Sequence, residues 1–379
     1  MVTYPSDWEF RNVGEICHIS TGTGDTKDAV PNGLFPFFVR SKKVERINDF
    51  EFEGEAVLTA GDGVGTGKVF HYVDGRFKAH QRVYVLNNFQ NFDTRFFYYY
   101  FSSAFLDEVE KYTAKSSVDS VRRPMIANMR IPRPRLPEQR AIAEVLSGFD
   151  EHLANLDELI TKKKAVRDGA RETLASGRQR LSGFTGYWRD TTLGAIATLN
   201  PVTPLPDTFT YVDLESVQGT EMVTSRSVDK ISAPSRAQRL ASSGDIFYQT
   251  VRPYQRNNYL FKSSAKDVVF STGYAQIRTQ EVPEFLFAAV QQNQFTDQVL
   301  ERCTGTSYPA ITPTALKEVS VRLPKSHSEQ RAIAEVLFGM DDEIRLLAEE
   351  RAKVEQLKLG AMDDLLTGRV RLTLGKEAA

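Results

Sequence analysis

Nine consecutive residues, EQRAIAEVL, occur twice in this chain, at Glu138–Leu146 and, 191 positions later, at Glu329–Leu337. An identity of this length is far beyond chance, so the chain contains an internal duplication and its fold must contain this segment twice. The duplication extends beyond the nine residues. The further matching residues are Gly177-Arg178-x-Arg180-Leu181 with Gly368-Arg369-x-Arg371-Leu372, and Trp8 and Gly14 with Trp188 and Gly194.

The composition is that of a globular protein. With 379 residues, 41% of them hydrophobic, the chain is long enough for two or three domains that each bury a core. The net charge is −1, so a DNA-binding surface would need charge that is clustered locally or completed by a partner. Cys17 and Cys303 form no CxxC pair, residues 1–9 contain no secretory leader, and no apolar run is long enough to cross a bilayer. We therefore expect a cytoplasmic protein without disulfides or membrane spans.

Each repeat begins a long segment whose apolar residues follow one another at spacings of four and three, which predicts the a/d seam of a coiled coil. Gly177 and Gly368 suit left-handed caps, so each helix should run for about 40 residues, or roughly 60 Å. Because the first helix carries the chain to the second domain, a second helix packed along it should return antiparallel. The predicted seam residues are Ile142, Leu146, Phe149, Leu153, Leu156 and Ile160 in the first helix, and Ile333, Leu337, Met340, Ile344 and Leu347 in the second.

The regions outside the helices contain short β-rich runs bounded by turn residues. The expected fold class is therefore α/β (α+β): two mixed α/β domains separated by a pair of long antiparallel coiled-coil helices, with an internal pseudo-twofold repeat. The predicted division is a first domain over residues 1–134, a central helix over 135–181, a second domain over 182–325 and a distal helix over 326–379. Within the domains we expect strands at Ala56–Thr59, Lys68–Tyr72, Arg82–Leu86, Asp245–Thr250, Tyr259–Lys262 and Ala275–Arg278, and helical stretches at Arg95–Lys111 and Pro283–Glu301.

Several loops combine side chains that read base edges with side chains that bind phosphates. Arginine and asparagine can form paired hydrogen bonds to bases in the major groove, whereas lysine and serine suit the phosphate backbone. One such residue alone is more often a solvated surface charge, but their clustering in loops of both domains favours a nucleic-acid surface. The candidates are Arg40, Lys42, Lys43, Lys68, Lys78, Arg82, Lys115, Arg122 and Arg123 in the first domain, and Arg226, Arg236, Arg239, Arg252, Tyr254, Arg256, Asn257, Ser307 and Tyr308 in the second.

The chain shows no motif for catalysis. The segment Gly61–Lys68 is rich in glycine, but a Walker A loop would need glycine at Asp62 and serine or threonine at Val69. The string nearest to the Asn/Asp-Pro-Pro-aromatic tetrapeptide of amino methyltransferases, at Asn200–Thr203, lacks the second proline and the aromatic residue. Histidines and cysteines are scattered without metal-ligand spacing. We therefore expect neither enzymatic activity nor a metal or cofactor site in this chain.

The paired EQRAIAEVL helix starts, the helix-ending Gly-Arg-x-Arg-Leu and the Trp…Gly pair before each domain together resemble the DNA-specificity subunit of type I restriction-modification enzymes, over essentially the full length. The resemblance implies that each variable domain is a target recognition domain, which reads one half of a bipartite double-stranded DNA target. The helices would set the length of the unread spacer.

The same resemblance implies a non-catalytic subunit with large partners. It would assemble with two modification (methyltransferase) subunits and with restriction (translocase/nuclease) subunits, and those partners would use S-adenosylmethionine, ATP and Mg. The helix positions Gln139, Arg140, Gln330 and Arg331, which we expect to be exposed, are candidate partner contacts.

Two alternatives stay open at this point. The chain could serve a related nuclease-methyltransferase system, or it could be a coiled-coil scaffold with two protein-binding domains and no affinity for DNA. A steep salt dependence of DNA binding would separate a DNA reader from such a scaffold.

Overall fold

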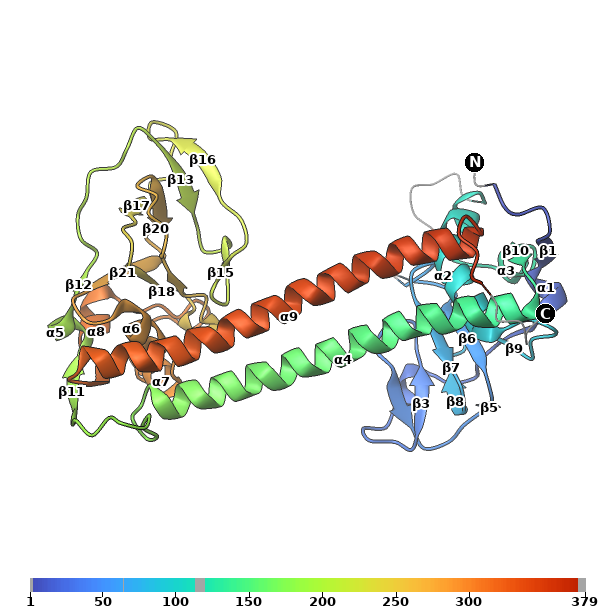
Figure 1. Cartoon of the computed structure of the whole chain (residues 1–379), viewed down its shortest axis with the longest axis horizontal. Helices are drawn as coiled ribbons and strands as arrows, with labels where there is room; N and C mark the ends of the chain where they lie inside the picture. The colour runs from blue at the N-terminus through green and yellow to red at the C-terminus, as the bar shows by residue number, and fades with distance from the viewer. Residues whose placement is uncertain (1–2, 64, 113–119, 374–379) are drawn as a thin grey trace. The chain divides into compact units, whose positions relative to one another are not determined.

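The computed structural model describes residues 3–63, 65–112 and 120–373. The chain divides into two compact units, which differ from the predicted four-part division because each includes part of both long helices. The first unit comprises Met1–Asp157 and Glu349–Ala379, and the second comprises Glu158–Ala348. Each unit contains one mixed α/β domain (Figure 1), as the sequence predicts.

The domain of the first unit is built on two four-stranded sheets and a short ribbon. One sheet has the antiparallel order β2-β9-β6-β7, and the other has the order β4-β3-β8-β5, in which β3 and β8 run parallel. The ribbon pairs β1 with β10, which leads into the first long helix. The elements are β1 Glu9–Asn12, α1 Val13–Ile16, β2 His18–Thr21, η1 Thr26–Asp28, β3 Phe35–Phe38, β4 Glu45–Ile47, β5 Phe52–Glu53, β6 Ala56–Ala60, β7 Phe70–Val73, β8 Arg76–Ala79, β9 Val83–Asn87, α2 Thr94–Glu110, α3 Arg123–Ala127 and β10 Arg130–Arg133.

The domain of the second unit repeats this topology. Its sheets have the orders β12-β21-β18-β19 and β16-β13-β20-β17, again with one parallel pair, β13 and β20, and its ribbon pairs β11 with β22. A hairpin of β14 and β15 is added. The elements are β11 Trp188–Thr192, α5 Leu193–Ile196, β12 Ala197–Leu199, β13 Thr208–Val212, β14 Val217–Gln218, β15 Glu221–Met222, β16 Arg226–Asp229, β17 Ala237–Leu240, β18 Ile246–Gln249, η2 Pro253–Gln255, β19 Tyr259–Leu260, β20 Val268–Ser271, β21 Tyr274–Thr279, α6 Pro283–Val290, α7 Asn293–Glu301, α8 Pro313–Lys317 and β22 Ser320–Pro324.

The six strands predicted most clearly are confirmed within one or two residues, because each is a β-rich run that ends at turn residues. The helical stretch predicted at Arg95–Lys111 is confirmed as α2. Its counterpart in the second unit is instead two helices, α6 and α7. The break falls at Gln292, whose extended backbone (φ −66°, ψ 152°) forms the N-cap of α7.

The two long helices, α4 Leu136–Leu174 and α9 His327–Thr367, contain 39 and 41 residues, which confirms the predicted lengths. Each ends just before a glycine in the left-handed region, Gly177 with φ 73° and Gly368 with φ 71°. Within each unit the helices are antiparallel, because residue numbers rise along one helix as they fall along the other (Figure 1). Ion pairs between them include Asp150–Lys358 and Asp157–Arg351 in the first unit, and Lys163–Glu343 and Arg167–Asp341 in the second.

The predicted seam residues face inward along both helices, as expected for apolar side chains between packed helices. Those near the helix starts also join the domain cores: Ile142 and Leu146 in the first unit, Ile333 and Leu337 in the second. The coiled-coil geometry itself stays a prediction. Buried seam residues are Ile142, Leu146, Leu156, Ile160, Ile333, Leu337 and Ile344, and half-buried ones are Phe149, Leu153, Met340 and Leu347.

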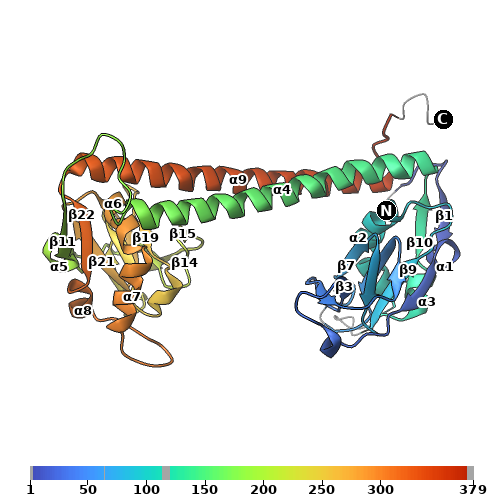
Figure 2. The ribbon, with the colours of Figure 1, turned by 90° about the horizontal axis from the view of Figure 1, so that it is seen from below.

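Aromatic packing fixes the first domain on its helix. Rings of α2 stack along the helix, with centroids 5.1 Å apart for Phe97 and Phe101 and 4.4 Å apart for Phe101 and Phe105. From the same helix, the Tyr99 hydroxyl donates a hydrogen bond to Asp150 of α4 at 2.6 Å. Figure 2 shows strands β3, β7 and β9 of this unit on one side of its long-helix segments. The hydrogen bond from α2 to α4 therefore ties the first domain to its long helix.

Candidate nucleic-acid interface

The repeated motifs meet at a joint where each domain is attached to the long helices. In the first joint, buried Glu138 at the start of α4 accepts hydrogen bonds from Arg371, which follows the end of α9 (Nη2–Oε2, 2.9 Å). Arg371 also donates to Asp7 at 3.0 and 3.1 Å. In the second joint, Glu329 of α9 accepts from Arg180, beyond the end of α4, at 2.7 and 2.9 Å. Each joint thus combines the start of one repeat with the end of the other.

A tryptophan completes each joint. A Cβ atom on Gly177 would lie 2.8 Å from the Trp188 ring, and one on Gly368 would lie 3.1 Å from the Trp8 ring, so glycine is required for space as well as for its positive φ. The Trp188 indole N–H also donates to Glu329 at 3.3 Å. The sequence is identical at both places because the same joint is built twice.

The expectation that Gln139 and Gln330 are exposed is wrong. Both side chains are fully buried. The Gln139 side chain accepts from the backbone N–H of Asp93, the N-cap of α2, at 2.8 Å and donates to the carbonyl of Pro134 at 2.8 Å. Gln330 makes the equivalent bonds to Val282, the N-cap of α6, and Pro324, both at 2.9 Å. A buried amide must satisfy its hydrogen bonds, and these glutamines do so by tying each domain to its helix.

In the first domain, three loops converge on one carboxylate beyond the end of β6. Asp62 accepts hydrogen bonds from Nη1 of Arg40, at 2.8 Å, and from Nη1 of Arg82. Gly61 joins the loops through its backbone, with its N–H donating to Arg82 at 2.8 Å and its carbonyl accepting from Val121 at 2.7 Å. We call Arg40, Asp62 and Arg82 the first edge.

The electrostatics of the first edge favour an anion. Burial raises the pKa of the Asp62 carboxyl, but the hydrogen bonds and charges of Arg40 and Arg82 outweigh that effect and hold the pKa below its usual value. Asp62 is therefore ionised at neutral pH, and the three side chains together carry one net positive charge. The arginine side chains are 44% and 60% exposed, so both are accessible to a ligand.

The second domain carries different residues at the equivalent place, beyond the end of β18. The Arg252 guanidinium lies 4.2 Å from the centre of the Tyr308 ring, and its backbone N–H donates to Pro309 at 2.7 Å. Tyr254 and Tyr308 are exposed, at 51% and 64%. We call Arg252, Tyr254 and Tyr308 the second edge.

The loop of the second edge has a strained and firmly held backbone. Arg252 and Arg256 both adopt left-handed conformations, with φ of 54° and 55°, which is uncommon for a non-glycine residue and typical of functional loops. Buried amides hold this loop in place. Asn258 accepts from the backbone N–H of Gln249 at 2.7 Å, and the Gln249 side chain donates to Val251 at 2.8 Å.

The edges correspond in topology. In the first domain Asp62 forms a backbone bridge to Ser120, and in the second Val251 forms one to Ala310. In the first domain the bridge connects the loop after β6 with the loop that precedes α3. In the second domain it connects the loop after β18, which has the same place in its sheet as β6, with the loop that precedes α8. Duplication has therefore conserved the position of each edge while its side chains have diverged.

The other predicted DNA-binding residues are spread more widely. Several are exposed but belong to neither the first nor the second edge, and Lys115 lies outside the described residues. Arg256 and Asn257 act within the second domain, where Arg256 donates to Asn293 at 2.7 Å and Asn257 accepts from the N–H of Gly219 at 2.9 Å. The exposed residues are Lys42, Lys43, Lys68, Arg122, Arg123, Arg226, Arg236 and Ser307, and the half-buried ones are Lys78, which pairs with Asp49, and Arg239.

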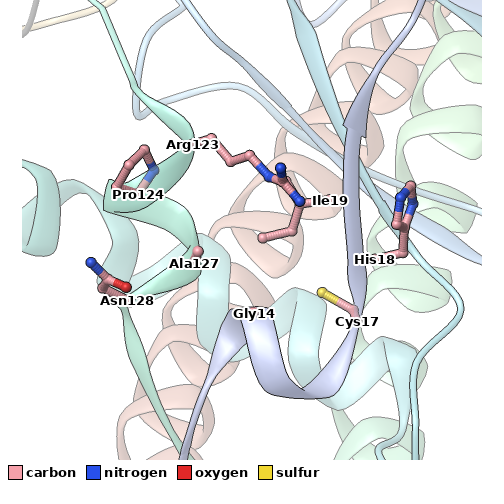
Figure 3. Close-up of a pocket in the computed structure, with 8 residues that line it drawn as sticks. All are labelled: Gly14, Cys17, His18, Ile19, Arg123, Pro124, Ala127 and Asn128. Atoms are coloured by element: carbon pink, nitrogen blue, oxygen red, sulfur yellow. The ribbon is translucent and has the colours of Figure 1, made fainter.

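Arg123 lies at a pocket between α1, β2 and α3, which Figure 3 shows with the guanidinium extending from α3 toward Ile19. The repeated glycines belong to this region: a Cβ on Gly14 would lie 3.2 Å from Ala127, and one on Gly194 would lie 2.9 Å from Lys317. Gly14 and Gly194 thus allow α1 and α5 to approach their partner helices closely. Burial raises the pKa of the Cys17 thiol, which faces this pocket, to about 12.

Sequence reasoning missed Asp62 and the crossed pairing of the joints. In the sequence, Asp62 stands out only as the residue that rules out a Walker A loop. Its place in a Gly-Asp-Gly turn is the signal that could have pointed to it.

Over residues 3–63, 65–112 and 120–373, no cluster of three or more His, Cys, Asp or Glu side chains could hold a metal ion. Within the same ranges no helix has the length and apolarity to cross a membrane.

A duplicated fold with an arginine-bearing loop edge on each copy suits a protein whose two domains each bind an anionic ligand such as nucleic acid. The sequence matches the family described as "Type I restriction modification DNA specificity domain" over residues 5–164 and 219–356. The chain therefore belongs to this family.

Relatives and solved structures agree with that assignment. The chain is 24% identical to the type I restriction enzyme EcoDI specificity subunit of Escherichia coli, over 90% of this chain and 83% of the relative. It is 23% identical to the MjaVIII specificity subunit of Methanocaldococcus jannaschii, over 97% and 94%. The fold is similar to that of the type I S subunit from M. genitalium, with a TM-score of 0.64 and 18% identity over 97% of both chains.

Proposed function

We propose that this chain is the DNA-specificity subunit of a type I restriction-modification enzyme and that its two domains each read one half of a bipartite double-stranded target. One observation carries the proposal: the two domains share one topology and place a loop edge at the same position, yet the first edge contains Arg40, Asp62 and Arg82 and the second Arg252, Tyr254 and Tyr308. Shared topology suits two equivalent docking positions on DNA. Divergent side chains suit two different base sequences.

The long helices are proposed to set the unread spacer. Each is continuous and enters both units, so residues added to the helices would change the separation of the domains by about 1.5 Å per residue. One base pair advances along DNA by about 3.4 Å. A rigid helical connection would therefore translate helix length into a defined number of spacer base pairs.

Identical residues that the fold does not bury support docking of two copies of one partner. Within the repeated EQRAIAEVL, the first Glu, the Gln, the Ile, the second Ala and the Leu side chains pack or pair internally, and the first Ala is half-buried. The other three positions are exposed in both copies. Val145 and Val336 are 38% and 37% exposed. The exposed identical residues are Arg140, Glu144 and Val145 in the first unit and Arg331, Glu335 and Val336 in the second.

A surface repeated in this way fits two identical modification subunits, one on each helix start, as in an assembly with pseudo-twofold symmetry. Arg140 and Arg331 therefore stay candidate partner contacts. A solved structure that concerns complex assembly and conformational transition of the type I R-M system has a similar fold, with a TM-score of 0.57 and 18% identity. Restriction subunits would join the same assembly.

The chemistry of the system is proposed to reside in the partners, and this chain to be non-catalytic. S-adenosylmethionine would be used by the modification subunits, and ATP and Mg by the restriction subunits. Burial raises the pKa of the Cys17 thiol to about 12, so this one pocket residue is protonated at neutral pH and is a poor nucleophile.

Binding by the reconstituted methyltransferase tests the proposal. The chain should be purified together with its modification subunits and titrated with its bipartite duplex and with a scrambled duplex at several salt concentrations. We expect preference for the bipartite duplex by about 10³-fold or more, and a steep loss of affinity with salt. Equal binding to both duplexes would contradict the proposal.

A further inference from the structure

The first edge contains two arginines whose orientation is set by one carboxylate. Asp62 accepts from Nη1 of Arg40 and from Nη1 of Arg82, and its own side chain is only 19% exposed. The loops that supply these residues are joined by backbone hydrogen bonds, including Gly61 to Arg82 at 2.8 Å. His80, whose pKa is lowered chiefly by burial, accepts from the Arg82 backbone N–H at 3.0 Å and so fixes the start of this loop.

Among the residues that the structure describes, nothing occupies one hydrogen-bonding edge of each arginine. A guanidinium presents Nε–H and Nη2–H side by side, and the bonds to Asp62 use only Nη1. Across the described parts of the chain, Nε–H and Nη2–H of Arg40 and Arg82 have no hydrogen-bond partner. Two parallel donors on each of two exposed arginines are therefore available to a ligand with paired acceptors.

Within DNA, guanine is the base that matches this donor pair in the major groove. It presents N7 and O6 as adjacent acceptors, whereas adenine presents one acceptor and one donor there. Arginine pairs with guanine through two parallel hydrogen bonds, and each such pair discriminates against other bases by a large factor. A carboxylate behind the guanidinium reduces its freedom before binding, so less conformational entropy is lost when the base is bound.

We propose that Arg40 and Arg82 each read a guanine in the half-site of the first domain, and that Asp62 is the positioning residue that orients both arginines. This inference rests on the proposed function and deepens it by naming bases for one half-site. Arg82 and Arg40 act directly on the bases, while Asp62 acts only through them. The second edge reads its half-site by other contacts.

The test uses the methyltransferase complex and the target identified by sequencing its genomic methylation. Each guanine of the first half-site is replaced singly by 7-deazaguanine, which lacks the N7 acceptor. For wild type we expect about tenfold weaker binding at two positions, one for each arginine. In R40A and R82A the penalty at one of these positions should disappear, which a double-mutant cycle measures for each arginine–guanine pair.

Three further variants separate base reading from folding and charge. R82K keeps the positive charge but has no paired donor edge, so it should keep non-specific binding and lose discrimination at its guanine. D62N keeps both arginines and should reduce discrimination at both positions together. R11A is the matched control, since Arg11 is an exposed arginine of the same domain paired with Glu9 at 2.9 Å, and it should bind as wild type does.

Several results would overturn the inference. The first is a half-site of the first domain that contains no G·C pair. The second is full retention of both 7-deazaguanine penalties in R40A and R82A. The third is an equal loss of affinity for all sequences in these variants together with a shallower salt slope, which would identify phosphate contacts. If wild type itself showed no bipartite preference, the proposed function would fail as well. If wild type read its target and the variants read it equally well, only the inference would fail.

Discussion

The second joint should make a large contribution to the stability of its unit, and R180A tests this. Glu329 is 1% exposed and receives two hydrogen bonds from Arg180, at 2.7 and 2.9 Å. Removing one partner of a buried ion pair costs about 3–5 kcal/mol, because a charge is left buried without compensation. The Trp188 indole still donates to Glu329 at 3.3 Å, so we expect the lower limit of about 3 kcal/mol.

Hydrogen exchange is the suitable assay, because a chain with two units need not unfold in a single step. The opening free energy of amides in β11, β22 and the start of α9 should fall in R180A, while amides of the first domain should keep theirs. The control is K162A, because its pair with Glu158 is exposed and screened by solvent and should contribute little to local stability.

A double variant separates the buried charge from lost packing. R180A combined with E329Q removes the uncompensated charge, so it should recover at least about 1 kcal/mol relative to R180A alone. The reasoning would be refuted if R180A changed local stability no more than K162A does, or if it weakened both units equally.

The remaining predictions concern the helices, the partner surface and one thiol. One variant adds seven residues after Ile160 and seven more after Ala348 on the facing helix. It should lengthen the spacer by about three base pairs and leave both half-sites unchanged. Methylome sequencing that finds an unchanged spacer would contradict this prediction. Native mass spectrometry should find one bound modification subunit instead of two for R140E or R331E, and two would argue against docking there. Iodoacetamide at pH 8 should leave Cys17 unmodified in the native protein, and rapid labelling would contradict its burial. Because folding raises the Cys17 pKa, its contribution to stability should be complete below pH 9 and lost between pH 9 and about 12, with C17A lacking that change in pH titrations of unfolding.

Much of the fold could be predicted because its signals are local. The seam of α4 and α9 is visible as a spacing of four and three, and the helix ends are marked by Gly177 and Gly368. Strands such as β6 and β21 are short β-rich runs between turns. Antiparallel packing followed from connectivity, since α4 must carry the chain to the second domain.

The side-chain roles that were missed depend on distant parts of the chain. Gln139 looked like an exposed helix residue, but it is buried because Asp93 and Pro134 supply its hydrogen-bond partners. The pairing of Glu138 with Arg371 joins residues that are 233 positions apart, in different repeats. No periodicity in the sequence encodes such a contact.

The same limit applies to the candidate interface. Arg40 and Arg82 were recognised as cationic loop residues, but their common partner Asp62 lies 22 and 20 positions away from them. Arg252 was recognised too, whereas its stacking on Tyr308 depends on the backbone bridge between Val251 and Ala310. Residue type indicated the kind of ligand, and only the folded chain showed which residues act together.

The most direct measurement of the central claim is methylome sequencing of cells that express this chain with its modification subunits, alongside a chimera in which residues 182–325 come from another specificity subunit. Wild type should methylate one bipartite sequence, and the chimera should change one half-site while the other half-site and the spacer are retained. A change in both half-sites, or the absence of bipartite methylation by wild type, would contradict two independent readers on a shared frame.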